Sequence, residues 1–308
     1  MHGPQLTVVL LCHNRPQLAV EAIRSILNQT NKNFRFVVSD NSSNDELQIR
    51  LKSEFPNIAR LSWFPCVPAF YHINNVIRTI ETRYFVMFHD DDLMEPAYVQ
   101  HILDRFERFP SAAAIGTNAY PIDMKGEIKG RELWYHGPRG DKHLTDRRDL
   151  LAQYLVNDLG GIAPFSSYAY NLPIIRGIFT DFGAGRDYCD TLFLLEIMKR
   201  GPIVWIDKPL TRIRIHEGNQ SNFCAVREYK IFIAWVRREF RGQVSTIQID
   251  EYRFPRLFLA LARRGRLPSA AFRYFLVAFP RLMIASSSFR MRVVRKLIAT
   301  VRSVLKLH

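Results

Sequence analysis

The sequence contains few cysteines and no long uninterrupted apolar segment. Cys12, Cys66, Cys189 and Cys224 show no close pairing, which argues against a zinc site and against a disulfide framework. No segment reaches 18 consecutive apolar residues, so we expect no transmembrane helix. The first residues also lack the basic start and long apolar core of a signal peptide. We therefore expect a reduced, cytoplasmic protein.

The excess of basic over acidic residues is confined to about the last quarter of the chain. The 308 residues are 47% apolar and 23% charged, a globular composition, and the net charge is +14. Residues 1–226 contain 25 basic and 25 acidic residues, whereas residues 227–308 contain 18 basic and 4 acidic ones. A nucleic-acid-binding protein would instead carry its basic residues over a folded face, so we expect no nucleic-acid partner. The pattern predicts a catalytic domain over 1–225 and a basic helical tail over 226–308.

The first part of the chain alternates apolar strand-like segments with amphipathic helical ones. The expected strands are 7–12, 34–38, 58–64 and 84–88. The expected helices begin at Pro16 and cover 45–55 and 74–81. This alternation predicts an α/β fold, with a Rossmann-like, mainly parallel sheet and flanking helices.

Polar residues follow three of these strands, at positions 13–14, 40–43 and 89–92. In an open α/β sheet, ligands bind at the carboxyl ends of the strands. The three segments therefore predict a single site.

Asp90, Asp91 and Asp92 directly follow a strand-like apolar run. Adjacent carboxylates repel one another by about 1 kcal/mol per close pair even in water, so a cation is expected to compensate them. Carboxylate oxygens suit Mg²⁺ or Mn²⁺ shared with substrate phosphates. The alternative is a solvated turn that caps the helix beginning near Pro96.

Five motifs in order give the sequence a family resemblance. They are TVVLLCHNRPQLAVEAIRSILNQT, FRFVVSDNSSND, FVMFHDDDLMEP, GRDYCDTLFL and TRIRIHEGNQS. Over about residues 5–222 the sequence resembles an inverting glycosyltransferase of family 2 with the nucleotide-sugar-binding GT-A fold, of the kind that builds bacterial cell-surface polysaccharides.

The resemblance implies a set of residues that contact the donor. His13 and Asn14 correspond to nucleotide contacts, and Asp40 to a carboxylate that accepts the imide N–H of uracil. Asn74 corresponds to an asparagine near the diphosphate, and Asp90 to a ribose contact. The Asp40 side chain could instead form only a local turn.

The resemblance also implies the metal ligands and the base. Asp91 corresponds to the principal ligand of Mn²⁺ or Mg²⁺, and His216 to a histidine that touches the metal or the diphosphate. Asp190 corresponds to the general base. Alternatively, His216 is an ordinary loop histidine, and Asp190 caps the helix that follows it while Asp187 serves as base.

The sequence departs from the family pattern at three places. His89 replaces a common aspartate, Ile73 an expected arginine, and Cys189 the usual glutamate before the base. These departures bear on the donor more than on the reaction class. Arg212 and Arg214 either line the diphosphate or are solvated strand residues.

The function implied is inverting transfer of a sugar from a nucleotide-diphosphate donor, a UDP- or dTDP-sugar, to a hydroxyl of a saccharide or lipid-linked acceptor. The alternatives are a catalytically inactive GT-A-like scaffold or binding protein, and a sugar nucleotidyltransferase. The latter usually has a glycine-rich N-terminal loop, where this chain has His13-Asn14-Arg15-Pro16.

The tail has the pattern of an interfacial helix. Over 289–307, apolar residues recur on one helical face, and basic residues surround the rest. We therefore expect the protein to lie peripherally on the inner face of a membrane. Docking of this helix on the catalytic domain or on a partner protein is the alternative.

Overall fold

The computed structural model describes residues 3–63, 65–130, 133–135, 139–155, 165–181, 183–216, 226–264 and 269–294. The strands in these residues are β1 (Leu6–Cys12), β2 (Phe34–Asp40), β3 (Ala59–Ser62), β4 (Tyr84–His89), β5 (Leu93–Met94), β6 (Ala114–Ile122), β7 (Lys142–Leu144), β8 (Ala169–Asn171) and β9 (Ile203–Arg214). The α-helices are α1 (Pro16–Leu27), α2 (Glu46–Glu54), α3 (Ala69–Thr79), α4 (Tyr98–Arg108), α5 (Arg147–Leu155), α6 (Leu172–Ile175), α7 (Cys189–Ile197), α8 (Val226–Glu239), α9 (Thr246–Arg264) and α10 (Ser269–Ala285), with short 3₁₀ helices η2 (Phe165–Ser167) and η3 (Arg186–Tyr188).

The described strands form one mixed sheet in the order β3-β2-β1-β4-β8-β6-β9-β5, with β7 paired to β9. β1, β2, β3 and β4 are mutually parallel, as are β6 and β9, whereas β5, β7 and β8 pair antiparallel. The predicted α/β class is thus confirmed. The predicted helix over 74–81 is displaced, because α3 begins directly after Pro68, whose ring favours an extended entry to the helix.

Successive side chains of β1 belong alternately to two hydrophobic clusters, one on each face of the sheet. Leu6, Val8 and Leu10 pack with apolar residues of α1, α2 and α4. Val9 and Leu11 belong to the other cluster, which includes α3, α5, α7, α8 and α9. This period-two pattern explains why β1 reads as a continuous apolar run, since both of its faces are buried.

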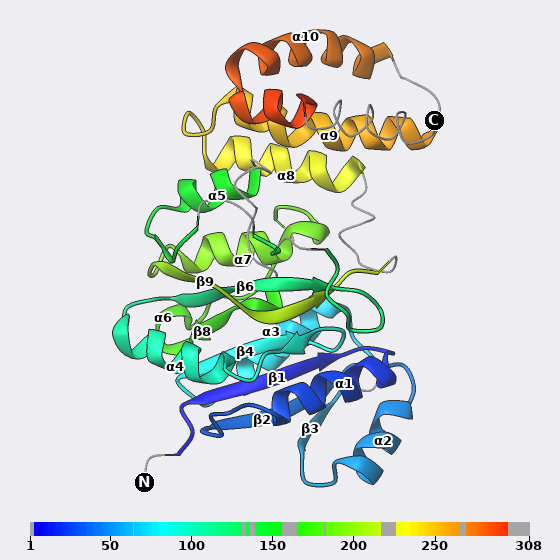
Figure 1. The fold of residues 1–308 in the computed structure, drawn as a ribbon, viewed down its shortest axis with the longest axis vertical. Coiled ribbons are helices and arrows are strands. Elements are labelled where there is room, and N and C mark those ends of the chain that lie inside the picture. The colour runs from blue at the N-terminus through cyan, green and yellow to red at the C-terminus, as the bar shows by residue number, and fades with distance from the viewer. Residues whose placement is uncertain are drawn as a thin grey trace.

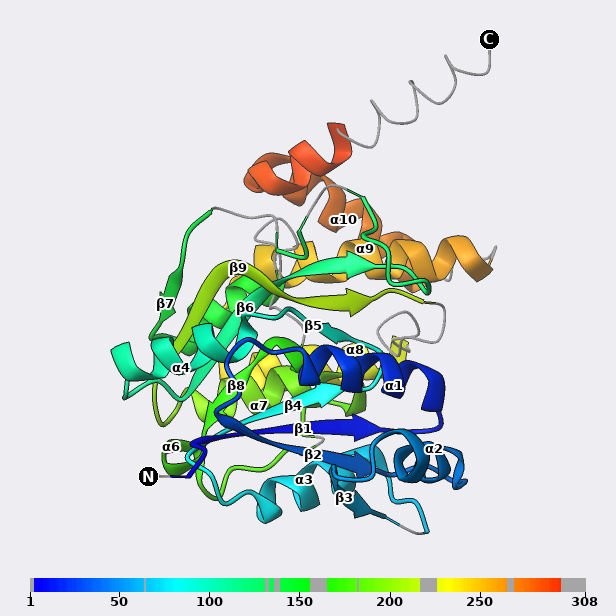
Figure 2. The ribbon, with the colours of Figure 1, turned by 60° about the horizontal axis from the view of Figure 1, so that its bottom comes forward.

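The three strands that precede the polar segments end at one edge of the sheet. Cys12 is paired with Asp40 across β1 and β2, and Leu11 with His89 across β1 and β4. Figure 2 shows β1, β2 and β4 pointing in the same direction. The register therefore brings the three polar segments to one place.

The C-terminal helices α8, α9 and α10 stack in successive layers beyond the sheet (Figure 1). The rings of Phe232 in α8 and Tyr188 in η3 are stacked with centroids 4.2 Å apart, and the Tyr252 hydroxyl of α9 donates to the Tyr188 hydroxyl at 2.8 Å. The division into domains at 225/226 stays a prediction. None of the helices in the described residues is both long and apolar enough to cross a membrane.

Candidate active site

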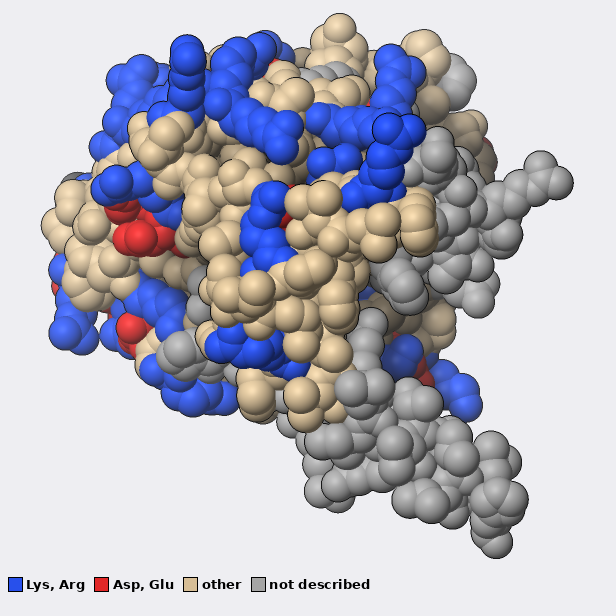
Figure 3. Space-filling model, turned by 90° about the horizontal axis from the view of Figure 1, so that it is seen from above, with Lys and Arg blue, Asp and Glu red and all other residues tan. Residues whose placement is uncertain are grey.

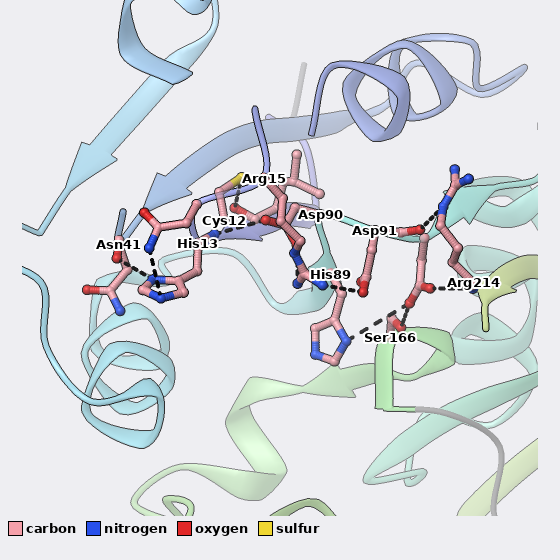
Figure 4. A network of polar contacts seen from close by, with 12 residues as sticks. Cys12, His13, Arg15, Asn41, His89, Asp90, Asp91, Ser166 and Arg214 are labelled. Atoms are coloured by element: carbon pink, nitrogen blue, oxygen red, sulfur yellow. Dashed lines mark hydrogen bonds and ion pairs between the residues drawn. The ribbon is translucent and has the colours of Figure 1, made fainter. Parts of the chain in front are cut away.

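The loop after β1 is bonded to the loops after β2 and β4. The backbone N–H of His13 donates to Asp90 Oδ2 at 2.9 Å, and His13 Nδ1 lies 2.7 Å from the Asn41 carbonyl oxygen (Figure 4). The predicted nucleotide contacts His13 and Asn14 are both exposed at this edge. The side chains expected from three separate segments thus meet in one place.

Asn14 adopts a left-handed backbone conformation, with φ of 53°. Asparagine tolerates this conformation better than most residues. The turn allows its N–H to donate to Ser42 Oγ at 2.9 Å, while its own Oδ1 accepts the N–H of Ser43 at 2.9 Å. The loops after β1 and β2 are therefore fixed relative to each other.

Arg15 bridges two of the three aspartates. Its guanidinium contacts Asp90 Oδ1 and Asp91 Oδ2, both at 2.5 Å. Asp90 is completely buried, and burial raises its pKa to about 6 against the opposing effects of Arg15 and the His13 N–H. A ribose contact by Asp90 would require Arg15 to move. Arg15 was not predicted as a site residue, although it adjoins the His13-Asn14 pair in the sequence.

The two predicted metal-binding residues contact each other. His216 Nε2 lies 3.0 Å from Asp91 Oδ2. Burial opposes ionisation of Asp91, but the neighbouring His89, Arg15 and His216 outweigh it and lower its pKa. The Asp91 carboxylate is therefore favoured in its ionised form, in contact with Arg15 and His216.

Two further residues complete a group that could hold a metal ion. One ligand atom each from His89, Asp91 and Asp92 lies within 4.8 Å of the others. Asp92 is buried and accepts hydrogen bonds from Ser166 Oγ and from the backbone N–H of Arg214, and burial together with Asp91 raises its pKa. The donor set fits a divalent cation, which would compensate the carboxylates and favour their ionised forms. The sequence placed Asp92 in the acidic cluster expected to bind a cation, but the family resemblance singled out only Asp91 and His216 as metal-binding residues.

Arg214, at the end of β9, holds in place the loop after β4 that contains Asp91 and Asp92. It is buried, and its Nε donates to the Asp91 carbonyl at 2.8 Å. Its other donors reach the Met124 carbonyl at 2.7 Å and Glu21 Oε2 at 2.8 Å. Arg214 is therefore a buried support rather than a solvated strand residue. Arg212 instead pairs with Glu95 at 2.5 Å.

Asp40 lies at the edge of a pocket of about 570 Å³ beside the end of β2. The pocket is lined by Asp40, Ser42, Asn44, Asp45, Gln48, Ser62 and Trp63. Asp40 Oδ1 accepts the N–H of Ser42 at 3.0 Å, so the local turn that the sequence allowed is present. The Trp63 indole N–H donates to Ser39 Oγ at 2.9 Å, which fixes the ring at the pocket. Trp63 was not predicted as a site residue, because no local pattern in the sequence distinguishes it from other strand residues.

Asn74 is buried and bonded to Thr180. Its Nδ2 donates to the Thr180 carbonyl, and its Oδ1 accepts the Thr180 N–H and hydroxyl, all at 2.9 Å. These contacts tie α3 to the segment before α7. To contact the donor diphosphate, the Asn74 side chain would have to give up its hydrogen bonds to Thr180. The role of Asn74 as a diphosphate contact stays a prediction.

Asp190 lies in the first turn of α7. Its Oδ1 accepts the N–H of Thr191 at 2.7 Å, and burial raises its pKa. The Asp190 charge also adds to burial in raising the pKa values of Tyr168 and Tyr170. The hydrogen bond from Thr191 to Asp190 at the start of α7 is therefore present, and the role of Asp190 as general base stays a prediction. The glycine- and aromatic-rich segment 160–171, between the acidic cluster and Asp190, is predicted to contact the acceptor; its positions 160–164 lie outside the described residues.

Residues 7–163, half of the chain, match the family described as Glycosyl transferase family 2. The chain belongs to that family. Over 220 residues it is 24% identical to the chondroitin synthase of Escherichia coli, a match that covers 71% of this chain and 30% of the synthase. The chain thus spans under a third of the length of that relative.

Solved structures show the same fold. S. aureus TarS 1–349 in complex with UDP-GlcNAc superposes with a TM-score of 0.56 at 15% identity, covering 80% of this chain and 71% of that one. The mannosyltransferase PcManGT from Pyrobaculum calidifontis, in complex with GDP-Man and Mn²⁺, gives 0.50 at 16% identity, covering 99% and 88%. The expected family and GT-A fold are confirmed.

Proposed function

We propose that this protein transfers a sugar from a nucleotide-diphosphate donor to an acceptor hydroxyl, with inversion at the anomeric carbon. The observation that carries the proposal is the meeting of the β1, β2 and β4 loops, which sets the Asp91 cluster and the Asp40 pocket at one sheet edge. Structural relatives hold UDP-GlcNAc or GDP-Man in this fold.

The pocket beside β2 is the proposed nucleobase site. Asp40 supplies an acceptor for the imide N–H of uracil or thymine, and the Trp63 ring offers a flat apolar face to the base. This chemistry favours a UDP- or dTDP-sugar. His13 and Asn14, exposed on the adjoining loop, are placed to contact the rest of the nucleotide.

The acidic cluster is the proposed site for Mn²⁺ or Mg²⁺. Asp91 is the principal ligand, with His216 beside it and His89 and Asp92 as further candidates. When bound, the ion neutralises charge on the departing diphosphate. Arg214 and Ser166 hold the loop in the conformation that presents these side chains.

Asp190 is the proposed general base. The acceptor oxygen forms a bond to the anomeric carbon, the bond from that carbon to the diphosphate oxygen breaks, and the acceptor proton passes to Asp190. Burial raises the Asp190 pKa, which strengthens it as a base. Attack opposite the leaving group inverts the configuration.

The proposed acceptor is a saccharide or a lipid-linked saccharide at the inner face of a membrane. Support comes from the 18 basic and 4 acidic residues of 227–308, because such a segment is attracted to acidic lipids. Most of the amphipathic helix expected over 289–307 lies outside the described residues, which end at 294.

Thermal-shift measurements with UDP, dTDP and GDP, each with and without Mn²⁺, test the donor and metal assignments. A nucleotide that binds only the folded state raises the melting temperature, and we expect this rise to depend on Mn²⁺. Asp91→Asn should abolish the Mn²⁺-dependent rise, and Asp104→Asn, on an exposed turn of α4, should leave it unchanged.

Unchanged nucleotide affinity in Asp91→Asn would remove the metal assignment. A catalytically inactive scaffold predicts, in addition, that no nucleotide sugar is hydrolysed or transferred by the wild-type chain. Slow hydrolysis of one donor by the wild-type chain would exclude that alternative.

A further inference from the structure

The outward face of α10 is unusually apolar. Twelve large apolar side chains are exposed in the described part of the chain; five of them lie in α10, and two more, Met291 and Val294, follow it. Ile284 is 80% exposed, Leu276 59% and Val277 58%. Single exposed apolar residues are ordinary, but a contiguous patch marks a surface that contacts something apolar.

These side chains share one side of the helix because of their spacing. Leu276, Val277 and Ile284 occupy positions i, i+1 and i+8, which lie on one side of a helix, and all three are exposed. The opposite side packs inward through Ala278 and Leu282, which are buried. α10 is the outermost described helix (Figure 1), and the exposure of Leu276, Val277 and Ile284 shows that the body of the molecule does not cover these side chains.

The acidic residues nearest to α10 are turned inward. Asp250 is buried and accepts hydrogen bonds from the Tyr274 hydroxyl at 3.1 Å and from Arg281 at 3.0 Å. Glu251 is buried and accepts the Ser288 hydroxyl at 2.8 Å. Figure 3 looks onto this end of the molecule, where Lys and Arg side chains lie among residues that carry no charge and acidic side chains appear mainly at the left edge.

We infer that the outward face of α10 rests on a membrane surface that contains acidic lipids. Hydrocarbon next to the headgroups would cover the apolar side chains, and acidic headgroups would compensate the surrounding basic ones. A second copy of the chain would place two basic surfaces against each other, and a neutral apolar partner would leave the charges uncompensated. The combination of apolar and basic groups therefore favours anionic lipid.

This inference deepens the proposed function, because it identifies the surface that would hold the enzyme beside a lipid-linked acceptor. Its evidence is independent of the donor site. A failure of nucleotide-sugar hydrolysis would overturn the proposed chemistry alone. A failure of lipid binding would overturn the inference about α10 and the placement of the acceptor at a membrane, and would leave the sugar-transfer chemistry intact.

Co-sedimentation of the full chain with vesicles tests it. We expect binding to phosphatidylcholine vesicles that contain phosphatidylglycerol, weaker binding to phosphatidylcholine alone, and release as salt rises, because salt screens exposed charges. Leu276→Asn with Ile284→Asn should lower the partition coefficient by roughly tenfold or more, since two apolar side chains no longer enter the lipid.

Ile49→Asn is the matched control, because Ile49 is 58% exposed on α2, remote in sequence from α10. It should leave vesicle binding unchanged, and melting temperatures check that each variant folds. Equal binding to both kinds of vesicle at low salt, or undiminished binding by the double variant, would overturn the inference. So would a dimer in light scattering that the double variant dissociates, since a second copy would then cover the face.

Discussion

Arg214→Met removes the buried side chain that ties β9 to the acidic loop after β4. The wild-type guanidinium donates to the carbonyls of Asp91, Asp123 and Met124 and pairs with Glu21. Methionine keeps much of the apolar volume but donates no hydrogen bond. The loop that carries Asp91 and Asp92 would lose its main side-chain support.

The expected cost follows from these contacts. Each lost hydrogen bond contributes about 1 kcal/mol net, and a buried acceptor left without a donor costs about 1–3 kcal/mol. Met124 is exposed and Asp123 half-buried, so water can replace the guanidinium at both carbonyls. The Asp91 carbonyl and the ion pair account for most of the loss. We expect a destabilisation of about 3 kcal/mol.

Arg212→Met is the matched control, because it changes the same residue type two positions earlier on β9. Arg212 is 38% exposed and makes one ion pair with Glu95, so its loss should cost at most about 1 kcal/mol. Urea denaturation followed by tryptophan fluorescence measures both free energies of unfolding. If Arg212→Met costs as much as Arg214→Met, or Arg214→Met costs under about 1 kcal/mol, the support role is wrong.

Three further predictions concern the base, acid stability and the metal site. Asp190→Asn should retain donor binding but lower kcat by about 10²–10⁴-fold, and an inactive Asp187→Asn with an active Asp190→Asn would reverse the assignment. Burial lowers the pKa of His72 from its ordinary 6.5 to about 4, so the unfolded chain takes up a proton first as pH falls. His72 should therefore lower the free energy of unfolding of the wild type by up to about 3 kcal/mol as the pH falls from about 6.5 to about 4, and His72→Gln should lack this contribution. Urea titrations of both proteins at several pH values measure it. A difference in unfolding free energy between the two proteins that does not change with pH would contradict the prediction. Arg15→Met should bind Mn²⁺ several-fold more tightly in calorimetry without nucleotide, because the guanidinium no longer competes for its two carboxylates; weaker binding would show that Arg15 organises the site instead.

Some features follow from the sequence alone because they depend on neighbours along the chain. The apolar run of β1 and the helical periodicity after Pro16 predict these elements, since burial on both faces or on one stripe leaves a local pattern. Polar residues at strand ends predict one site, because parallel strands share an edge. The ordered motifs indicate the family, and the charge count locates the basic excess after residue 226.

Other features were decided only by tertiary structure, because they join residues far apart in sequence. Arg15 reaches Asp90 across 75 positions, and Arg214 reaches Asp91 across 123. Periodicity shows which side of an element is buried but not which partner lies opposite, so neither the Arg15 bridge nor the bonds of Asn74 to Thr180 could be predicted. For α10, the apolar residues alone do not distinguish an inward from an outward face. That choice depends on how α10 packs on α9, where the buried acids and Leu282 take the inner side and leave the other apolar side chains exposed.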